Sequence, residues 1–207
     1  MNAAIRPARA EDAQAATPLI FSSGPDAFNY VFSHRTRTDA GGFIAHAFAC
    51  DRGEFSWRYF WIVEVDGAVA GTASGYTGED ARDFLWPAVR QILHCNGLIA
   101  GARVIRRGLK IERIIVPPSR PDEFYIGNVA IAARLRGKGL GERLFAFLHE
   151  EARRRGASVC TLDVSVENPR AEALYTRLGY RVVKENASDL ENAAGTVVNH
   201  RRMAYEL

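Results

Sequence analysis

The segment Arg136-Gly137-Lys138-Gly139-Leu140-Gly141 is the part of the sequence whose composition points most directly to chemistry. Its three glycines lack Cβ atoms and let the backbone turn tightly. A helix is expected to begin at Leu140, and the unpaired N–H groups of its first turn concentrate partial positive charge. Arg136 and Lys138 add full charges. These features predict a pyrophosphate site, although an ordinary glycine-rich turn between a strand and a helix has the same composition.

Two better-known phosphate motifs do not fit this loop. A dinucleotide fingerprint requires glycine or alanine three positions after Gly139, where Glu142 stands. A Walker loop requires serine or threonine directly after its glycine and lysine, where Gly139 stands. The loop is therefore suited to phosphate but belongs to neither class.

Strands and helices alternate around the loop in a way that can position it. Residues 124–131 read as the strand before it, and residues 140–155 as an amphipathic helix that ends at Gly156. A mixture of strands and helices that includes a hairpin predicts an α+β fold with a mixed sheet. The other expected strands are 5–8, 59–65, 68–75, 159–166, 180–184 and 202–205, and the other expected helices are 11–21, 40–50, 82–98 and 169–178.

In this order and spacing, these segments resemble the GNAT superfamily of acetyl-CoA-dependent N-acetyltransferases. R-G-K-G-L-G is similar to the family's R-x-x-G-x-G/A motif, which cradles the CoA pyrophosphate. Y-I-G-N-V-A-I, ending at Ile131, resembles the family's fourth strand, and V-E-N-P-R-A-E-A-L-Y-T-R-L-G-Y, from Val166 to Tyr180, resembles its N-x-x-A-x-x-L-Y-x-x-x-G-F/Y signature. The resemblance is strongest over residues 124–184. It implies a GNAT fold, which is a twisted, mostly antiparallel mixed sheet with helices on both faces, here with a helical insertion before the fourth strand.

The resemblance also implies how acetyl-CoA would be held. Backbone N–H groups from Gly137 to Gly141 would bind the pyrophosphate. Val129 and Ile131 would pair with the pantetheine arm where the fourth and fifth strands splay apart, and an N–H near Val129 or Ala130 would polarise the thioester carbonyl. Asn168 resembles the family's pantetheine-contacting asparagine. An asparagine before proline is also a good helix N-cap, and the two roles are compatible.

Two side chains are candidates for proton transfer. Tyr175 matches the family's tyrosine that protonates the departing CoA thiolate, although a packed core tyrosine would have the same sequence context. The acceptor amine must lose a proton before it attacks, and Glu123 is the first candidate for the base, directly or through a water. Asp122 and Asp163 are alternatives. All three carboxylates are candidates because of their positions alone. Carboxylates of this kind are more commonly exposed surface groups without a catalytic role.

The composition limits what else the protein could be. Its 207 residues, with a formal net charge of +3, suffice for one core, so we expect a single domain over 1–207 in which 78–121 is an insertion. No apolar run approaches the roughly 18 residues that cross a bilayer, and the start does not resemble a secretory signal. The three cysteines lack metal-ligand spacing, and the basic clusters lack the interleaved aromatic residues of a nucleic-acid surface. We expect a cytoplasmic protein that uses no metal and binds neither nucleic acid nor membrane; a homodimer remains open.

The expected activity is transfer of an acetyl group from acetyl-CoA to a primary amine of a small molecule or peptide, by direct attack in a ternary complex. Two alternatives remain open. One is a non-catalytic acyl-CoA-binding regulatory domain, which would be indifferent to Tyr175→Phe. The other is an acyltransferase that uses a longer acyl-CoA. The insertion is expected near the acceptor side, so the identity of the amine is open as well.

Overall fold

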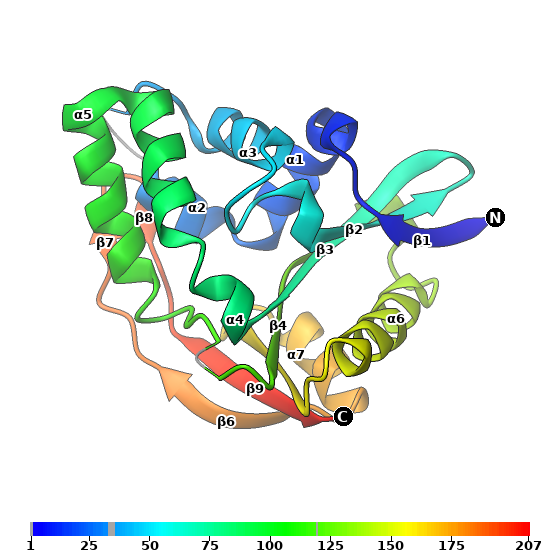
Figure 1. Cartoon of the computed structure of the whole chain (residues 1–207). Coiled ribbons are helices and arrows are strands. Elements are labelled where there is room, and N and C mark those ends of the chain that lie inside the picture. Colours follow the sequence, from blue (N-terminus) through cyan, green and yellow to red (C-terminus); the bar gives the residue numbers. More distant parts are fainter. Residues whose placement is uncertain (1, 33–35, 119) are drawn as a thin grey trace.

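The computed structural model describes residues 2–32, 36–118 and 120–207, which fold around a seven-stranded sheet (Figure 1). The strand order is β1-β2-β3-β4-β5-β9-β6, and among these strands only the β4–β5 pair is parallel. The predicted α+β class and mostly antiparallel mixed sheet are therefore confirmed. The strands are β1 (Ala3–Pro7), β2 (Phe60–Val65), β3 (Ala68–Thr77), β4 (Glu123–Ile131), β5 (Val159–Ser165), β6 (Arg181–Asn186), β7 (Glu191–Asn192), β8 (Gly195–Thr196) and β9 (His200–Glu206).

Helices cover both faces of the sheet. α6 (Leu140–Arg154) buries Leu144 and Leu148 against β4 on what we call the α6 face. α1 (Ala13–Ser23) and α3 (Ala40–Ala49) bury Ile20 and Ile44 against β2 on the opposite α1 face. The remaining helices are α2 (Pro25–Val31), α4 (Gly78–Ala81), α5 (Leu85–Ile111) and α7 (Pro169–Arg177), with 3-10 turns at Ala10–Asp12, Trp57–Tyr59 and Ala133–Leu135. Within the described chain, no helix combines the length and the apolar content that a membrane crossing requires.

The β2–β3 hairpin shows why this sequence forms a central sheet. Phe60 and Ile62 pack on the α1 face, and Trp61 and Val63 pack on the α6 face. Consecutive side chains of a strand point to opposite faces, so a strand buried on both sides needs a continuous apolar run. The turn between the strands has positive φ at Asp66 and Gly67, as a tight type I′ hairpin turn requires.

The predicted insertion is helical and folds back on itself. Gly97 has φ 72° and ψ 178°, which interrupts α5 and divides it into two helical segments that run in opposite directions in Figure 1. The chain after α5 is fastened to the sheet, because Asn186 of β6 donates to the carbonyl of Ile114 (2.9 Å) and the N–H of Val116 donates to Asp163 of β5 (3.2 Å). The insertion therefore ends directly over the α1 face of β5 and β9.

His149 of α6 is expected to make the stability of the protein depend on pH. Its side chain is buried, with Nε2 2.9 Å from the Tyr180 hydroxyl and the ring stacked on Tyr205. Burial lowers the pKa of His149 to about 4 from its usual 6.5. Between these values the unfolded chain binds a proton that the folded chain does not. The free energy of unfolding is therefore highest above about pH 6.5, and acidification toward pH 4 should lower it by about 3 kcal/mol.

Urea unfolding at pH 7, 5.5 and 4.5 would measure this loss. His149→Gln, which cannot titrate, should unfold at a lower urea concentration at pH 7 but should show a smaller decline on acidification. An equally steep decline in the variant would assign the pH dependence to other groups.

Candidate active site

The glycine loop precedes α6 and borders open space. Gly137 and Gly139 both have φ 76°, a left-handed conformation that L side chains rarely adopt. A Cβ on either glycine would meet no atom within 4 Å, and residues 136–139 are exposed. Gly139 is the N-cap of α6, and because it has no side chain, it leaves the N–H groups of the first turn free for another acceptor. The loop therefore has exposed backbone N–H groups without a capping side chain, and binding of a pyrophosphate by these groups stays a prediction.

The loop is fixed between β4 and α7. Arg136 Nε donates to the carbonyl of Ile131 at the end of β4 (2.9 Å). A Cβ on Gly141 would lie 3.3 Å from Leu174, so this glycine allows α6 and α7 to approach closely. Lys138 is exposed and Leu140 is buried in the core of the α6 face. The structure thus brings the loop, the end of β4 and α7 together.

The strands β4 and β5 pair only at the start of β4. In the described chain their ladder runs from Glu123↔Val159 to Tyr125↔Thr161 and then stops. The other side of β5 remains paired with β9 up to Ser165↔His200. Beyond Tyr125 the two parallel strands therefore diverge, and each has a free edge facing the other. We call this opening the split.

A β-bulge in β4 lies at the split. Asn128 has φ 50°, and the register with β3 shifts between Thr72 and Ser74. The conformation is held by Asn128 Nδ2 donating to Ser74 Oγ (3.0 Å) and by Thr72 Oγ1 donating to the Asn128 carbonyl (3.1 Å). A bulge bends its strand, and this one lies just beyond Tyr125, the last residue of β4 that pairs with β5.

The bulge contains Val129 and is followed by Ala130 and Ile131, the residues expected to meet the pantetheine arm. The N–H of Ala132 is bonded to β3 at Ala70 (2.8 Å). Alternate residues of a strand direct their polar groups to opposite sides, so Ile131 directs its groups toward the split. The contact with Arg136 agrees with this orientation, because the Ile131 carbonyl that accepts it points away from β3.

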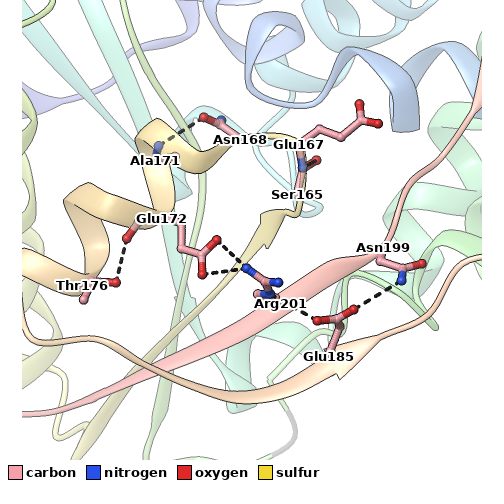
Figure 2. Close-up of polar contacts among 9 residues, drawn as sticks. All are labelled: Ser165, Glu167, Asn168, Ala171, Glu172, Thr176, Glu185, Asn199 and Arg201. Atoms are coloured by element: carbon pink, nitrogen blue, oxygen red, sulfur yellow. Dashed lines mark hydrogen bonds and ion pairs between the residues drawn. The ribbon is translucent and has the colours of Figure 1, made fainter.

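Asn168 begins α7, and Arg201 holds that helix against β9 (Figure 2). Asn168 Oδ1 accepts from the N–H of Ala171 (3.1 Å), which confirms its capping role. Its side chain is exposed, and a contact with pantetheine stays a prediction. Arg201 Nη1 lies 2.8 Å from both carboxylate oxygens of Glu172, and Arg201 Nε also donates to Glu185 (3.2 Å). These contacts set the position of α7 and hence of Tyr175.

Tyr175 lies on the α6 face, in a cluster of aromatic rings. Its ring centroid is 5.2 Å from that of Phe145 and 6.2 Å from that of Tyr180. The side chain is half-buried, and the partial loss of water around the phenol raises the pKa of Tyr175 to about 12, so the phenol is protonated at neutral pH. Within the described chain its hydroxyl has no hydrogen-bond partner. The side chain therefore carries a proton that is available for donation.

Glu123 belongs to a buried ion cluster on the α1 face, at the closed end of the split. Its Oε1 accepts from Thr161 Oγ1 (2.7 Å) and from Arg202. Arg202 also pairs with Asp163, its cross-strand neighbour (2.7 Å), and donates to the carbonyl of Val116. The sequence indicated both carboxylates but not the arginine between them, although Arg202 is the first residue of the expected strand 202–205 and a charged residue in a strand is a sign of a buried partner.

The arrangement suits acetyl-CoA on three grounds. The loop presents backbone donors of the kind that bind a pyrophosphate. The split offers a free strand edge to an amide-bearing arm, and it connects the α6 face, where Tyr175 lies, with the α1 face, where the carboxylates lie. The described residues hold no group of three or more His, Cys, Asp or Glu side chains placed to bind a metal ion.

Comparison with known proteins identifies the family. The family model described as the acetyltransferase (GNAT) family matches residues 28–180. A solved acetyltransferase structure is 25% identical, with a TM-score of 0.67 and coverage of 98% of both chains. The N-acetyltransferase from Staphylococcus aureus Mu50 is 20% identical, with a TM-score of 0.69 and coverage of 98% of this chain and 100% of its own. The yncA protein of Salmonella typhimurium, solved with its cofactor acetyl-CoA, is 17% identical, with a TM-score of 0.57 and coverage of 100% and 95%. No curated protein matches. The family match spans most of the chain, and the chain belongs to the GNAT family of acetyltransferases.

Proposed function

We propose that this protein transfers the acetyl group of acetyl-CoA to a primary amine, by direct attack in a ternary complex and without a covalent enzyme intermediate. The observation that carries the proposal is the split between β4 and β5, with the exposed glycine loop at the end of β4 and Tyr175 on the neighbouring helix. Family membership supports acyl transfer in general. The acetyl-CoA bound by the yncA structure supports that acyl donor.

The residues of the loop and of β4 would hold acetyl-CoA, which supplies an acetyl group activated as a thioester. N–H groups from Gly137 to Gly141 would bind the pyrophosphate, with Arg136 and Lys138 adding charge. Val129 and Ile131 would pair with the pantetheine arm. Because the Ile131 carbonyl already accepts from Arg136, that pairing would use the Ile131 N–H or would release Arg136 toward the phosphates. Asn168, at the start of α7, would contact the same arm.

Two proton transfers accompany the reaction, and one group for each lies near the split. Tyr175 would protonate the departing sulfur, and an N–H near Val129 would stabilise the negative charge on the reacting carbonyl, an effect worth about 3 kcal/mol. The Ala130 N–H, also named from the sequence, faces β3, because Ala130 is two residues from Ala132 and pairs with Thr72. The amine must first lose a proton to a base. Glu123 is the first candidate for that base and Asp163 is an alternative; both carboxylates pair with Arg202.

Thermal unfolding with acetyl-CoA, CoA, ATP and NAD in parallel tests the cofactor assignment. At about a hundredfold excess over Kd, a ligand that binds the folded state adds about 2.7 kcal/mol. For a protein of this size that corresponds to an increase in Tm of about 5–10 °C. We expect the increase with acetyl-CoA and CoA and none with NAD. An unchanged Tm with acetyl-CoA would contradict the proposal, and an increase with ATP or NAD instead would assign the glycine loop to another nucleotide.

A further inference from the structure

One oxygen of Asp163 has an environment that sets it apart from the other buried polar groups. The Asp163 side chain is 1% exposed. Its Oδ2 accepts from Arg202 Nη1 (2.7 Å) and from the N–H of Val116 (3.2 Å). Its Oδ1 is the one buried side-chain oxygen or nitrogen without a hydrogen-bond partner in the described ranges. Burying a carboxylate oxygen without a donor is costly, so native proteins rarely keep one where function does not require it.

Asp163 lies at the inner end of the split. The last pair between β4 and β5 is Tyr125↔Thr161, and Asp163 is two residues further along β5. Residues two apart share a face, so Asp163 lies on the α1 face with Thr161 and with its cross-strand partner Arg202. This face is opposite to the glycine loop and Tyr175. The chain around Val116 covers the cluster on this face, so an amine would reach Asp163 through the split, where the strands first part.

Glu123 belongs to the same cluster but occupies a different position. It lies in the part of β4 that is still paired with β5, and its Oε1 accepts from both Thr161 and Arg202. Its contacts fix the guanidinium of Arg202, and Arg202 in turn fixes Oδ2 of Asp163. The geometry therefore divides the two carboxylates into one that holds the arginine and one whose second oxygen has no donor aligned with it, with the Tyr125 hydroxyl beside the carboxylate.

The charges around Asp163 suit a cation with a proton to give. It is faced by Glu123 and Tyr125 from β4 and by Arg202 and His200 from β9. Burial raises the pKa of Asp163, while the nearby Arg202 opposes the rise. A carboxylate with a raised pKa is a better proton acceptor near neutral pH than an exposed one. Two carboxylates on one arginine leave a net negative charge, which attracts an ammonium and disfavours an acceptor with a carboxylate beside its nitrogen.

We propose that Asp163 is a catalytic residue that takes the proton from the acceptor ammonium, directly or through one water, and that Glu123 is a positioning residue that acts through Arg202. This inference rests on the proposed acetyl transfer. The ammonium gives one proton to Asp163, which passes it to solvent. The nitrogen lone pair then forms the C–N bond, the C–S bond breaks with its electron pair on sulfur, and the second nitrogen proton replaces the one that Tyr175 gives to sulfur.

Steady-state kinetics with alaninamide and 1,4-diaminobutane would test the inference, with thiol release as the readout and alanine as the matched carboxylate control. The wild type should turn over at least one of the two amines and should discriminate against alanine at least tenfold in kcat/KM. Asp163→Asn should lower kcat by about 10²-fold with little change in KM for acetyl-CoA. Glu123→Gln, which removes the other partner of Arg202, should lose less than tenfold.

The outcomes separate this inference from the proposed function. Equal kcat in Asp163→Asn and wild type, or a larger loss in Glu123→Gln, would overturn the role of Asp163. The wild type alone could also overturn the role of Asp163. It would do so if it turned over alanine as well as alaninamide, or if acetyl-CoA raised its Tm but it turned over neither amine. Failure of acetyl-CoA to raise the Tm of the wild type would instead overturn the proposed function. The kinetics of Asp163→Asn test the inference only if acetyl-CoA still raises the Tm of that variant. If acetyl-CoA does not raise it, the comparison of alaninamide with alanine in the wild type remains the test.

Discussion

Replacing Tyr175 with phenylalanine is expected to lower kcat by about 10²–10⁴-fold, because it removes the proton donor to the departing sulfur. The phenylalanine ring would keep the contacts with Phe145 and Tyr180. The hydroxyl has no partner in the described chain, so its loss leaves no buried group unpaired. Stability and the KM for acetyl-CoA should therefore stay close to those of the wild type.

The pKa of Tyr175 shows why this donor can work in its environment. Burial raises that pKa to about 12, whereas a thiol in water has a pKa of about 8.5, so complete transfer would be unfavourable in water. The thiol of Cys160, buried on β5 next to the split, shows what the same core does to sulfur. Burial raises its pKa to about 12 as well. A thiolate that leaves into a site closed to water is likewise more basic than in water, which reduces the difference in proton affinity between donor and acceptor.

Tyr205→Phe is the matched control for this experiment. Tyr205 lies in the same aromatic cluster, with its ring 5.4 Å from that of Tyr180 and stacked on His149. It loses the same atom from the same kind of ring. If both variants lose activity equally, the effect comes from the cluster and not from proton donation. If acetyl-CoA binds the wild type but no amine is turned over, the protein is the non-catalytic acyl-CoA-binding domain that the sequence leaves open.

The second half of the fold follows closely from the sequence because its signals are local. α6 begins at the expected Leu140, and β5 and α7 lie within one residue of the expected bounds. The apolar period of α6, the proline that starts α7 and the turn at Asp66-Gly67 each act within a few residues. The first half was less predictable. α1 runs from Ala13 to Ser23 where a helix over 11–21 was expected, and α2 was not expected.

The parts of the site that the sequence did not predict depend on contacts between distant residues. Asn128 adopts a left-handed conformation because Ser74 and Thr72 of β3 hold it there, 54 and 56 residues away. The ion cluster joins Glu123 to Arg202, 79 residues later, and is covered by the chain that follows α5. No pattern within either segment specifies these partners. The family resemblance supplied the split itself, and the bulge and the cluster lie beside it in this chain.

Gly139→Val is expected to raise the Kd for acetyl-CoA about 10–100-fold, since the N–H groups that it displaces are donors to a charged phosphate, each worth about 1.5–3 kcal/mol. Gly139 has φ 76°, where a β-branched residue is strained. Its new side chain would also project into the open space in front of the helix, where the built Cβ meets no atom within 4 Å. Isothermal titration of the variant with acetyl-CoA would measure the loss.

Gly156→Val at the opposite end of α6 separates binding from strain. Gly156 has φ 75°, is exposed, and has equally open surroundings, so valine costs about the same in stability at both positions, on the order of 1–2 kcal/mol. The two variants should therefore show similar decreases in Tm without ligand. Only Gly139→Val should lose affinity, because only Gly139 precedes the free N–H groups of the first turn. An equal loss of affinity in both would mean that α6 transmits the strain along its length, and an unchanged Kd in Gly139→Val would place the pyrophosphate away from the loop.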